Sequence, residues 1–220
     1  MYLTKKPKLL LRINTLIHLK FSQVANTDLL LCIRNRGITI NIYIRELQIK
    51  DLDDYFILNH PSQEHYNFNN PFLERTTLEE LKSCIVRIRQ RLENNEQPYK
   101  SLRMIANADN DKIVGEVSWY WKSKETLWLE VGIIIYDKNY WGKGIATIAL
   151  KKWISQVFEL HPEIVRIGLT TWSGNIGMCK VSEKIGLKQE ACYRNSIIVN
   201  DKFYDSISYG ILRDEWIIKN

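Results

Sequence analysis

The sequence predicts an α/β (α+β) fold: a single domain with a mixed, mostly antiparallel central sheet flanked by helices. Short extended segments and turns alternate through residues 102–136, which is typical of a meander. Helical and extended segments then alternate up to residue 212, as expected where helices cover a sheet. The chain has 220 residues, 45% of them hydrophobic and 25% charged, which is ordinary for a globular domain.

The first half of the chain is expected to contribute one strand and two helices before the meander. Residues 38–44 alternate enough to form a strand, and Asp51 could cap the helix that follows. Thr77 and Glu80 form a capping box before apolar residues spaced by four, three and four, so a second amphipathic helix begins there. Residues 59–72 show no period and are predicted to form a loop between the two helices.

The later elements follow from turn residues and breaks in periodicity. Asp109-Asn110-Asp111 and Asn200-Asp201 are typical turn residues, and Pro162 stops a helix. In chain order we expect strands over 102–106, 112–121 and 127–136, a helix from Gly144, a strand over 164–171, a helix over 175–185, and a hairpin of 188–198 with 202–212.

Residues 131–149, VGIIIYDKNYWGKGIATIA, contain a glycine turn between an apolar run and an amphipathic helix. Gly142 and Gly144 carry no Cβ, so a ligand can approach the backbone there. The unpaired N–H groups of the helix's first turn would face that ligand with the positive end of the helix dipole behind them. The pattern therefore predicts an anionic ligand, but its spacing fits neither a Walker loop nor a dinucleotide fingerprint.

Asn139 to Ala146 resembles the acyl-CoA pyrophosphate loop of the GCN5-related N-acetyltransferases (GNAT), Gln/Arg-x-x-Gly-x-Gly/Ala, with Asn139 in place of Gln or Arg. Its form Tyr-Trp-Gly-Lys-Gly-x-Ala is similar to the RimJ/RimL-like branch, which acetylates protein N-termini and other amines. Residues 175–187 resemble the family's later helix, Asn-x-x-Ser followed by Glu-Lys-x-Gly-Phe, and residues 212–216 (LRDEW) resemble its end. The resemblance covers about residues 40–216.

The resemblance implies an acetyl-CoA-dependent N-acetyltransferase that transfers an acetyl group directly to a primary amine in a ternary complex. The acceptor would be a protein N-terminus, for which a ribosomal protein is one candidate, or a small-molecule amine such as a polyamine or an antibiotic. A CoA-binding regulatory module without catalysis is the alternative. The resemblance leaves monomer and homodimer open.

Acetyl-CoA would lie along the strand before the glycine loop, along the loop itself, and against the later helix. Asn175 matches the family's Asn that bonds the cofactor, although it could simply cap its helix. In the strand and loop, the residues that the resemblance assigns to acetyl-CoA are Ile133, Ile134, Ile135, Asn139, Tyr140, Trp141, Gly142, Lys143, Gly144, Ile145 and Ala146.

Glu130 is the candidate general base. Alternation places it on a largely apolar strand face, where burial would strengthen it as a base, and the family often has an acidic residue here. An ion pair with a basic side chain of a neighbouring strand is the alternative, and Glu116 is the second candidate base.

The proton donor departs from the family pattern, because Met178 replaces the Ser of Asn-x-x-Ser and cannot protonate a thiolate. Ser182 lies four residues on and therefore on the same helical face. Ser182, Tyr193 and bulk water are the candidates.

The remaining features point to a cytoplasmic protein. A net charge of +6 favours a solvated basic face over specific nucleic-acid binding, and no apolar run reaches the ~18 residues of a membrane span. Residues 1–39 pair a basic start with an interrupted apolar stretch, so we treat them as an extension and residues 40–220 as the GNAT-like domain. No CxxC and no metal-ligand spacing occurs among the Cys and His residues, so we expect reduced thiols and no metal.

Overall fold

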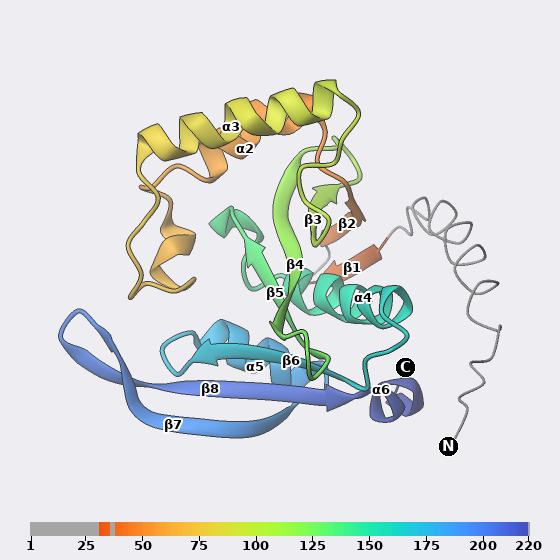
Figure 1. Ribbon diagram of the computed structural model, residues 1–220, viewed down its shortest axis with the longest axis vertical. Helices are drawn as coiled ribbons and strands as arrows, with labels where there is room; N and C mark the ends of the chain where they lie inside the picture. The colour runs from red at the N-terminus through yellow and green to blue at the C-terminus, as the bar shows by residue number, and fades with distance from the viewer. Residues whose placement is uncertain (1–30, 36–37, 220) are drawn as a thin grey trace, which may run out of the picture.

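The computed structural model describes residues 31–35 and 38–219, which form one layered α/β unit (Figure 1). Eight strands of this part of the chain make a single sheet in the order β1-β2-β3-β4-β5-β6-β8-β7. Neighbouring strands are antiparallel except β5 and β6, which run parallel. The predicted fold class is therefore confirmed. The strands are β1 (Leu31–Asn35), β2 (Ile38–Arg45), β3 (Leu102–Asn107), β4 (Ile113–Ser123), β5 (Trp128–Ile135), β6 (Arg166–Trp172), β7 (Lys188–Val199) and β8 (Lys202–Leu212).

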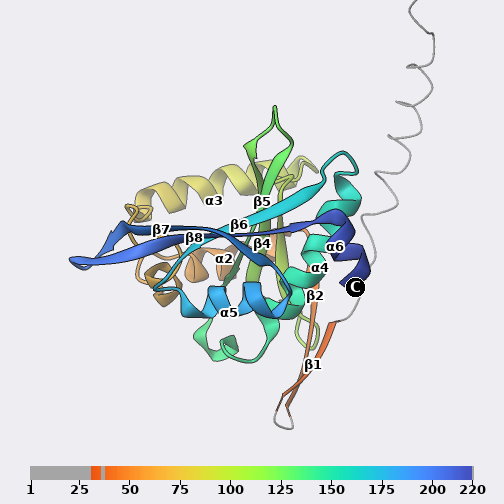
Figure 2. The same ribbon diagram turned by 90° about the horizontal axis from the view of Figure 1, so that it is seen from below.

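Helices cover both faces of the sheet (Figure 2). Ile133 packs with α4 on one face and the next residue, Ile134, packs with α2 and α3 on the other, as alternation along β5 requires. The helices are η2 (Ile49–Asp51), α2 (Leu52–Leu58), η3 (Glu64–Asn67), α3 (Leu78–Glu93), η4 (Lys138–Tyr140), α4 (Ile145–Leu160), α5 (Ile176–Lys184) and α6 (Arg213–Lys219).

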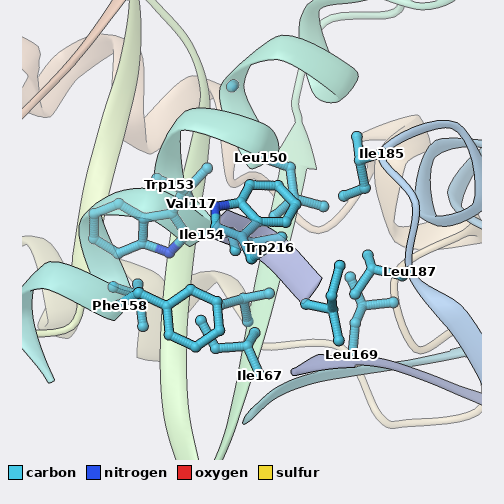
Figure 3. Close-up of a cluster of buried hydrophobic side chains, with 14 of the residues drawn as sticks. Val117, Leu150, Trp153, Ile154, Phe158, Ile167, Leu169, Ile185, Leu187 and Trp216 are labelled. Carbon is cyan, nitrogen blue, oxygen red and sulfur yellow. The ribbon is translucent and has the colours of Figure 1, made fainter. Parts of the chain in front are cut away.

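The larger core lies between α4 and the middle of the sheet. Leu150 and Ile154 of α4 are fully buried, and Trp153 is 2% exposed. Figure 3 shows these side chains facing Val117, Ile167 and other apolar residues of the sheet. Trp153 also donates its Nε1–H to the Ser118 carbonyl at 2.9 Å, which fixes α4 against β4. The apolar stripe of α4 thus covers the middle strands of the sheet.

The predicted capping box is confirmed at the start of α3. The Thr77 hydroxyl accepts the Glu80 N–H at 3.2 Å, and the Glu80 carboxylate accepts the Thr77 N–H at 2.8 Å. Asp51 is the N-cap residue of α2, as predicted, but its side chain makes no capping hydrogen bond there. Its carboxylate accepts from the Gln48 N–H at 2.8 Å and forms a buried ion pair with Arg45 at 2.6 Å.

The two ends of the described chain also differ from expectation. Residues 31–35 fall within the predicted extension, yet they form β1 and pair with β2 as the edge of the same sheet. Residues 1–30 lie outside the described residues. At the other end, the LRDEW segment leads into the short helix α6. Trp216 of this helix is 4% exposed and donates to the Ser155 hydroxyl of α4 at 3.0 Å.

The parallel strands β5 and β6 pair over only two positions, Leu129 with Ile167 and Glu130 with Gly168. Beyond these, the described part of β5 pairs with β4 and that of β6 pairs with β8. Figure 1 shows the two strands fanning apart. The sheet therefore opens into a fork that begins next to Glu130.

Candidate active site

A cavity of about 1230 Å³ occupies the fork. Its walls come from β5 and β6, from Ser118 and Tyr120 of β4, from the loop around η3, and from α5. Residues 140–148, which include the glycine loop and the first turn of α4, close one end. The cavity therefore extends from the glycine loop, the predicted anion site, to the residues of β4, β5 and β6 at the fork; we call these residues the cavity floor.

The glycine loop has the turn conformation that its two glycines predicted. Gly142 and Gly144 have φ of +69° and +89°, in the left-handed region that favours glycine. A Cβ on Gly142 would meet nothing within 4 Å. Gly144 is the N-cap residue of α4, so the N–H groups of the helix's first turn lie beside the cavity with no side chain capping them. Trp141 fixes the loop by donating its Nε1–H to the Ile135 carbonyl at 2.8 Å.

Three lysines supply the charge of the cavity wall. Lys143 lies in the loop, and Lys180 and Lys184 lie four residues apart on α5. Among the described residues that line the cavity there is no Asp or Glu. The sequence interpretation missed Lys180 and Lys184, although their spacing of four would have placed them on one helical face. This wall suits a ligand with phosphate groups.

The predicted cofactor residues all line the cavity except Asn139. Asn139 is exposed, and its backbone N–H is bonded to the Asp137 carboxylate at 2.8 Å. Asn175 lines the cavity but also caps α5, because its Oδ1 accepts the Met178 N–H at 3.0 Å. Its Nδ2 donates to the Phe68 carbonyl at 3.2 Å. The alternative of Asn175 as a helix cap is thus realised in the structure.

The loop over residues 59–72 contributes a further wall of the cavity. His65, Phe68, Asn69 and Asn70 line it, and Trp172 donates to the Phe68 carbonyl at 2.9 Å. The Phe68 ring also contacts Trp141 edge to face at 5.4 Å between centroids. This loop therefore docks against both β6 and the glycine loop.

His65 is a buried neutral imidazole in this wall. It is 3% exposed, and its Nε2 lies 2.9 Å from the Leu58 carbonyl, which places the ring proton on Nε2. Its Nδ1 is buried and has no hydrogen-bond partner among the described residues. Burial lowers the pKa of His65, so the ring is neutral at pH 7.

Glu130 lies at the start of the fork, 1% exposed. Its Oε2 accepts from the Tyr120 hydroxyl at 2.5 Å, and its Oε1 accepts from Lys122 Nζ at 2.9 Å and from the Thr170 hydroxyl at 3.1 Å. The ion pair with a neighbouring strand, which was the alternative to a catalytic role, is thus present. Gly168 makes room for this carboxylate, because a Cβ there would lie 3.2 Å from Glu130 Cγ.

Glu116, the second candidate base, lies on the same face of β4 as Ser118 and Tyr120 but does not line the cavity. It is half-buried and accepts from the Tyr136 hydroxyl. Burial raises the pKa of Glu116, and the Tyr136 hydrogen bond only partly opposes this rise.

The structure does not bring the two predicted proton donors into the cavity. Ser182 is fully buried and donates to the Met178 carbonyl at 3.0 Å, so its hydroxyl is used within α5. Tyr193 is 62% exposed on β7, beyond the cavity lining. Ser118, Tyr120 and Thr170 are among the hydroxyl-bearing residues that line the cavity, and the sequence patterns did not identify them. Alternation along β4 alone could have placed Ser118 and Tyr120 on one face.

Other kinds of site find little support in the described part of the chain. It holds no group of three or more His, Cys, Asp or Glu residues that could bind a metal ion. The four cysteines, Cys32, Cys84, Cys179 and Cys192, are unpaired thiols. None of the described helices is long and apolar enough to cross a membrane.

The forked sheet, the glycine loop at a helix N-terminus and the basic wall together define an α/β protein with a cavity, between two splayed parallel strands, whose lining suits a long anionic ligand. The chain belongs to the GNAT acetyltransferase family, because the sequence model of that family, an acetyltransferase (GNAT) domain, matches residues 41–188. Enzymes of this family use acetyl-CoA as the acetyl donor.

Two proteins of Bacillus subtilis illustrate the sequence relationship. "Putative ribosomal N-acetyltransferase YdaF" is 36% identical over 87 residues, which cover 40% of this chain and 46% of that protein. "Probable N-acetyltransferase YjcK" is 24% identical over 176 residues, which cover 79% of this chain and 95% of that protein. The chain thus spans about half of the first relative and nearly all of the second.

Solved structures share the fold at lower identity. A GNAT-family acetyltransferase from Bacillus anthracis has a TM-score of 0.62 at 19% identity, covering 84% of this chain and all of that one. The spermidine N-acetyltransferase from Vibrio cholerae, solved with CoA and spermine, has a TM-score of 0.62 at 18% identity, covering 80% and 98%.

Proposed function

We propose that this protein transfers an acetyl group from acetyl-CoA to a primary amine by direct transfer in a ternary complex, as a RimJ/RimL-like N-acetyltransferase. One observation carries the proposal: one cavity of the described residues runs from the glycine loop and a basic wall to a polar floor at the fork of the sheet. Two substrates that meet in one cavity can react without a covalent enzyme intermediate.

The loop end of the cavity supports the donor site. Open space at Gly142 and the N–H groups of the first turn of α4 suit the pyrophosphate of CoA, and Lys143, Lys180 and Lys184 suit its negative charge. Ile133 to Ile135 line the path from this loop towards the fork. The thioester would lie near the fork, because the pantetheine arm extends from the pyrophosphate along β5.

The floor and the η3 loop support an acceptor with one amino group. Hydroxyl and amide side chains are available there from Ser118, Thr170, Asn69 and Asn70, but none of the described lining residues is acidic. A polyamine carries several positive charges and would lack carboxylate partners in such a cavity. A protein N-terminus, with one amine flanked by peptide groups, fits these walls better, and a ribosomal protein is one candidate.

An amine panel tests the proposal. The protein would be incubated with acetyl-CoA and peptides with free N-termini, the same peptides with blocked N-termini, spermidine, and amino acids, while free thiol is measured. We expect thiol release with free N-termini and not with blocked ones, and mass spectrometry should find one added acetyl group.

The alternatives give different results. CoA binding without thiol release for any amine would identify a CoA-binding module. The reason to consider this alternative is that Met178 replaces the family's Ser. A tenfold preference for spermidine over every peptide would overturn the acceptor assignment while leaving acetyl transfer intact.

A further inference from the structure

Glu130 is buried beneath the cavity floor, whereas Tyr120 forms part of that floor. Glu130 is 1% exposed and does not line the cavity, whereas Tyr120 is 51% exposed and lines it. The two residues are directly opposite in the β4–β5 register. A substrate amine in the cavity can therefore reach the Tyr120 hydroxyl but not the Glu130 carboxylate.

The hydrogen bonds show that Tyr120 is the donor and Glu130 the acceptor in this pair. The Tyr120 hydroxyl donates to Glu130 Oε2 at 2.5 Å, while Lys122 and Thr170 donate to the other carboxylate oxygen. Desolvation, this hydrogen bond and the charge of Glu130 all raise the pKa of Tyr120. The phenol thus keeps its proton at neutral pH, and its O–H points to the carboxylate while the side chain borders the cavity.

Charged and aromatic side chains surround the Glu130 carboxylate. Lys122 Nζ also lies 5.0 Å from the centre of the Trp128 ring, and Arg166 lies 5.0 Å from the same ring. Arg166 is in turn paired with Glu190. The carboxylate is thus bonded on both oxygens and shielded from the cavity.

We propose that Tyr120 is the catalytic residue that exchanges a proton with the acceptor amine, and that Glu130 is a positioning residue that acts through it. The inference rests on the proposed acetyl transfer. It differs from the role expected for Glu130, because the carboxylate never touches the substrate.

The proton balance of the step is closed. As the amine nitrogen bonds to the thioester carbonyl carbon, its N–H proton passes to Tyr120 Oη while the phenol proton passes to Glu130 Oε2. When the C–S bond breaks, Tyr120 gives a proton to the departing thiolate and Glu130 returns its own. The products are the N-acetyl amine and CoA thiol, and both residues end in their starting states.

Tyr120→Phe tests the inference, with Tyr43→Phe as the matched control. Tyr43 also donates its hydroxyl to a carboxylate, that of Asp111, but it does not line the cavity. With the best acceptor from the amine panel, we expect Tyr120→Phe to lower kcat by on the order of 10²-fold and leave the KM for acetyl-CoA within about twofold. Tyr43→Phe should keep kcat within about twofold.

The double variant distinguishes a relay from two independent residues. If Glu130 acts through Tyr120, Glu130→Gln should have no further effect on kcat in the Tyr120→Phe background. Multiplying losses would overturn the inference, as would a kcat for Tyr120→Phe within threefold of the parent. Thermal melting must show both variants folded. Absence of turnover in the parent protein would instead overturn the proposed function, and this inference with it.

Discussion

Gly144→Val is the change that most directly tests the glycine loop as the CoA anchor. Gly144 is the N-cap of α4 with φ +89° and ψ 0°, a conformation that a β-branched residue adopts only under strain. The left-handed conformation costs an L-residue about 1–2 kcal/mol. The loop can relieve this strain only by rotating away from it, which would turn the N–H groups of the first turn of α4.

The expected magnitude follows from those groups. A hydrogen bond from a backbone N–H to a charged group is worth about 1.5–3 kcal/mol, so losing one such bond to pyrophosphate weakens binding at least tenfold. We expect calorimetric titration with CoA to show at least this rise in Kd. The residual strain should also lower the free energy of unfolding by about 1–2 kcal/mol.

Gly186→Val is the matched control. Gly186 follows α5 with φ +88°, nearly the φ of Gly144, but it does not line the cavity. The control should lose a similar amount of unfolding free energy and keep its affinity for CoA. A Kd for Gly144→Val within a factor of two of the parent, or an equal loss of affinity in both variants, would refute the anchor.

Four further outcomes are expected. CoA and acetyl-CoA should raise Tm, because a ligand at a hundredfold excess over its Kd stabilises the folded state by about 2.7 kcal/mol; ATP or NAD should have little effect, and equal stabilisation by ATP would contradict the assignment. Glu130→Gln should lower kcat by on the order of 10²-fold, no more than Tyr120→Phe does, with a loss that shrinks as pH rises and more amine is already neutral; normal turnover near pH 7 would remove Glu130 from the mechanism. Leu150→Ala, at a fully buried position, should cost about 2–5 kcal/mol in urea unfolding, while Val86→Ala, 55% exposed, should stay within about 0.5 kcal/mol. Because burial raises the pKa of Glu116, the folded state holds that proton more tightly than the unfolded chain, so its contribution to stability falls as pH rises above the unfolded pKa; Glu116→Gln should abolish this fall in unfolding curves measured from pH 4 to 7.

Local chemistry explains why the sequence predicted most elements. The capping box at Thr77, the glycine turn at Gly142 and Gly144, and the hairpin at Asn200-Asp201 each depend on residues close together in the chain. Such signals depend on neighbouring residues and need no long-range contact. Asp51 stands at the predicted N-cap position of α2, but its carboxylate does not cap the helix because it pairs with Arg45 of the preceding strand.

The site depends on contacts that no local pattern contains. Alternation gave the face of Glu130, but the β4–β5 register decided that it meets Tyr120, and the parallel pairing with β6 decided that Thr170 completes the group. The same distinction applies to the predicted proton donors. Helical spacing puts Ser182 on the face of Met178, but packing against the core buries its hydroxyl.

Sequence patterns were therefore enough to predict the order of the strands and α-helices from β2 to β8, the glycine loop and its family resemblance, but not β1 or α6. The predicted features depend on neighbouring residues and on backbone conformations that few residue types adopt. Tertiary structure alone decided where the sheet forks, which hydroxyl reaches the cavity and which lysines join the loop. These features depend on how far β5 and β6 stay paired and on which face of α5 meets the cavity, and both are set by packing between segments distant in the chain.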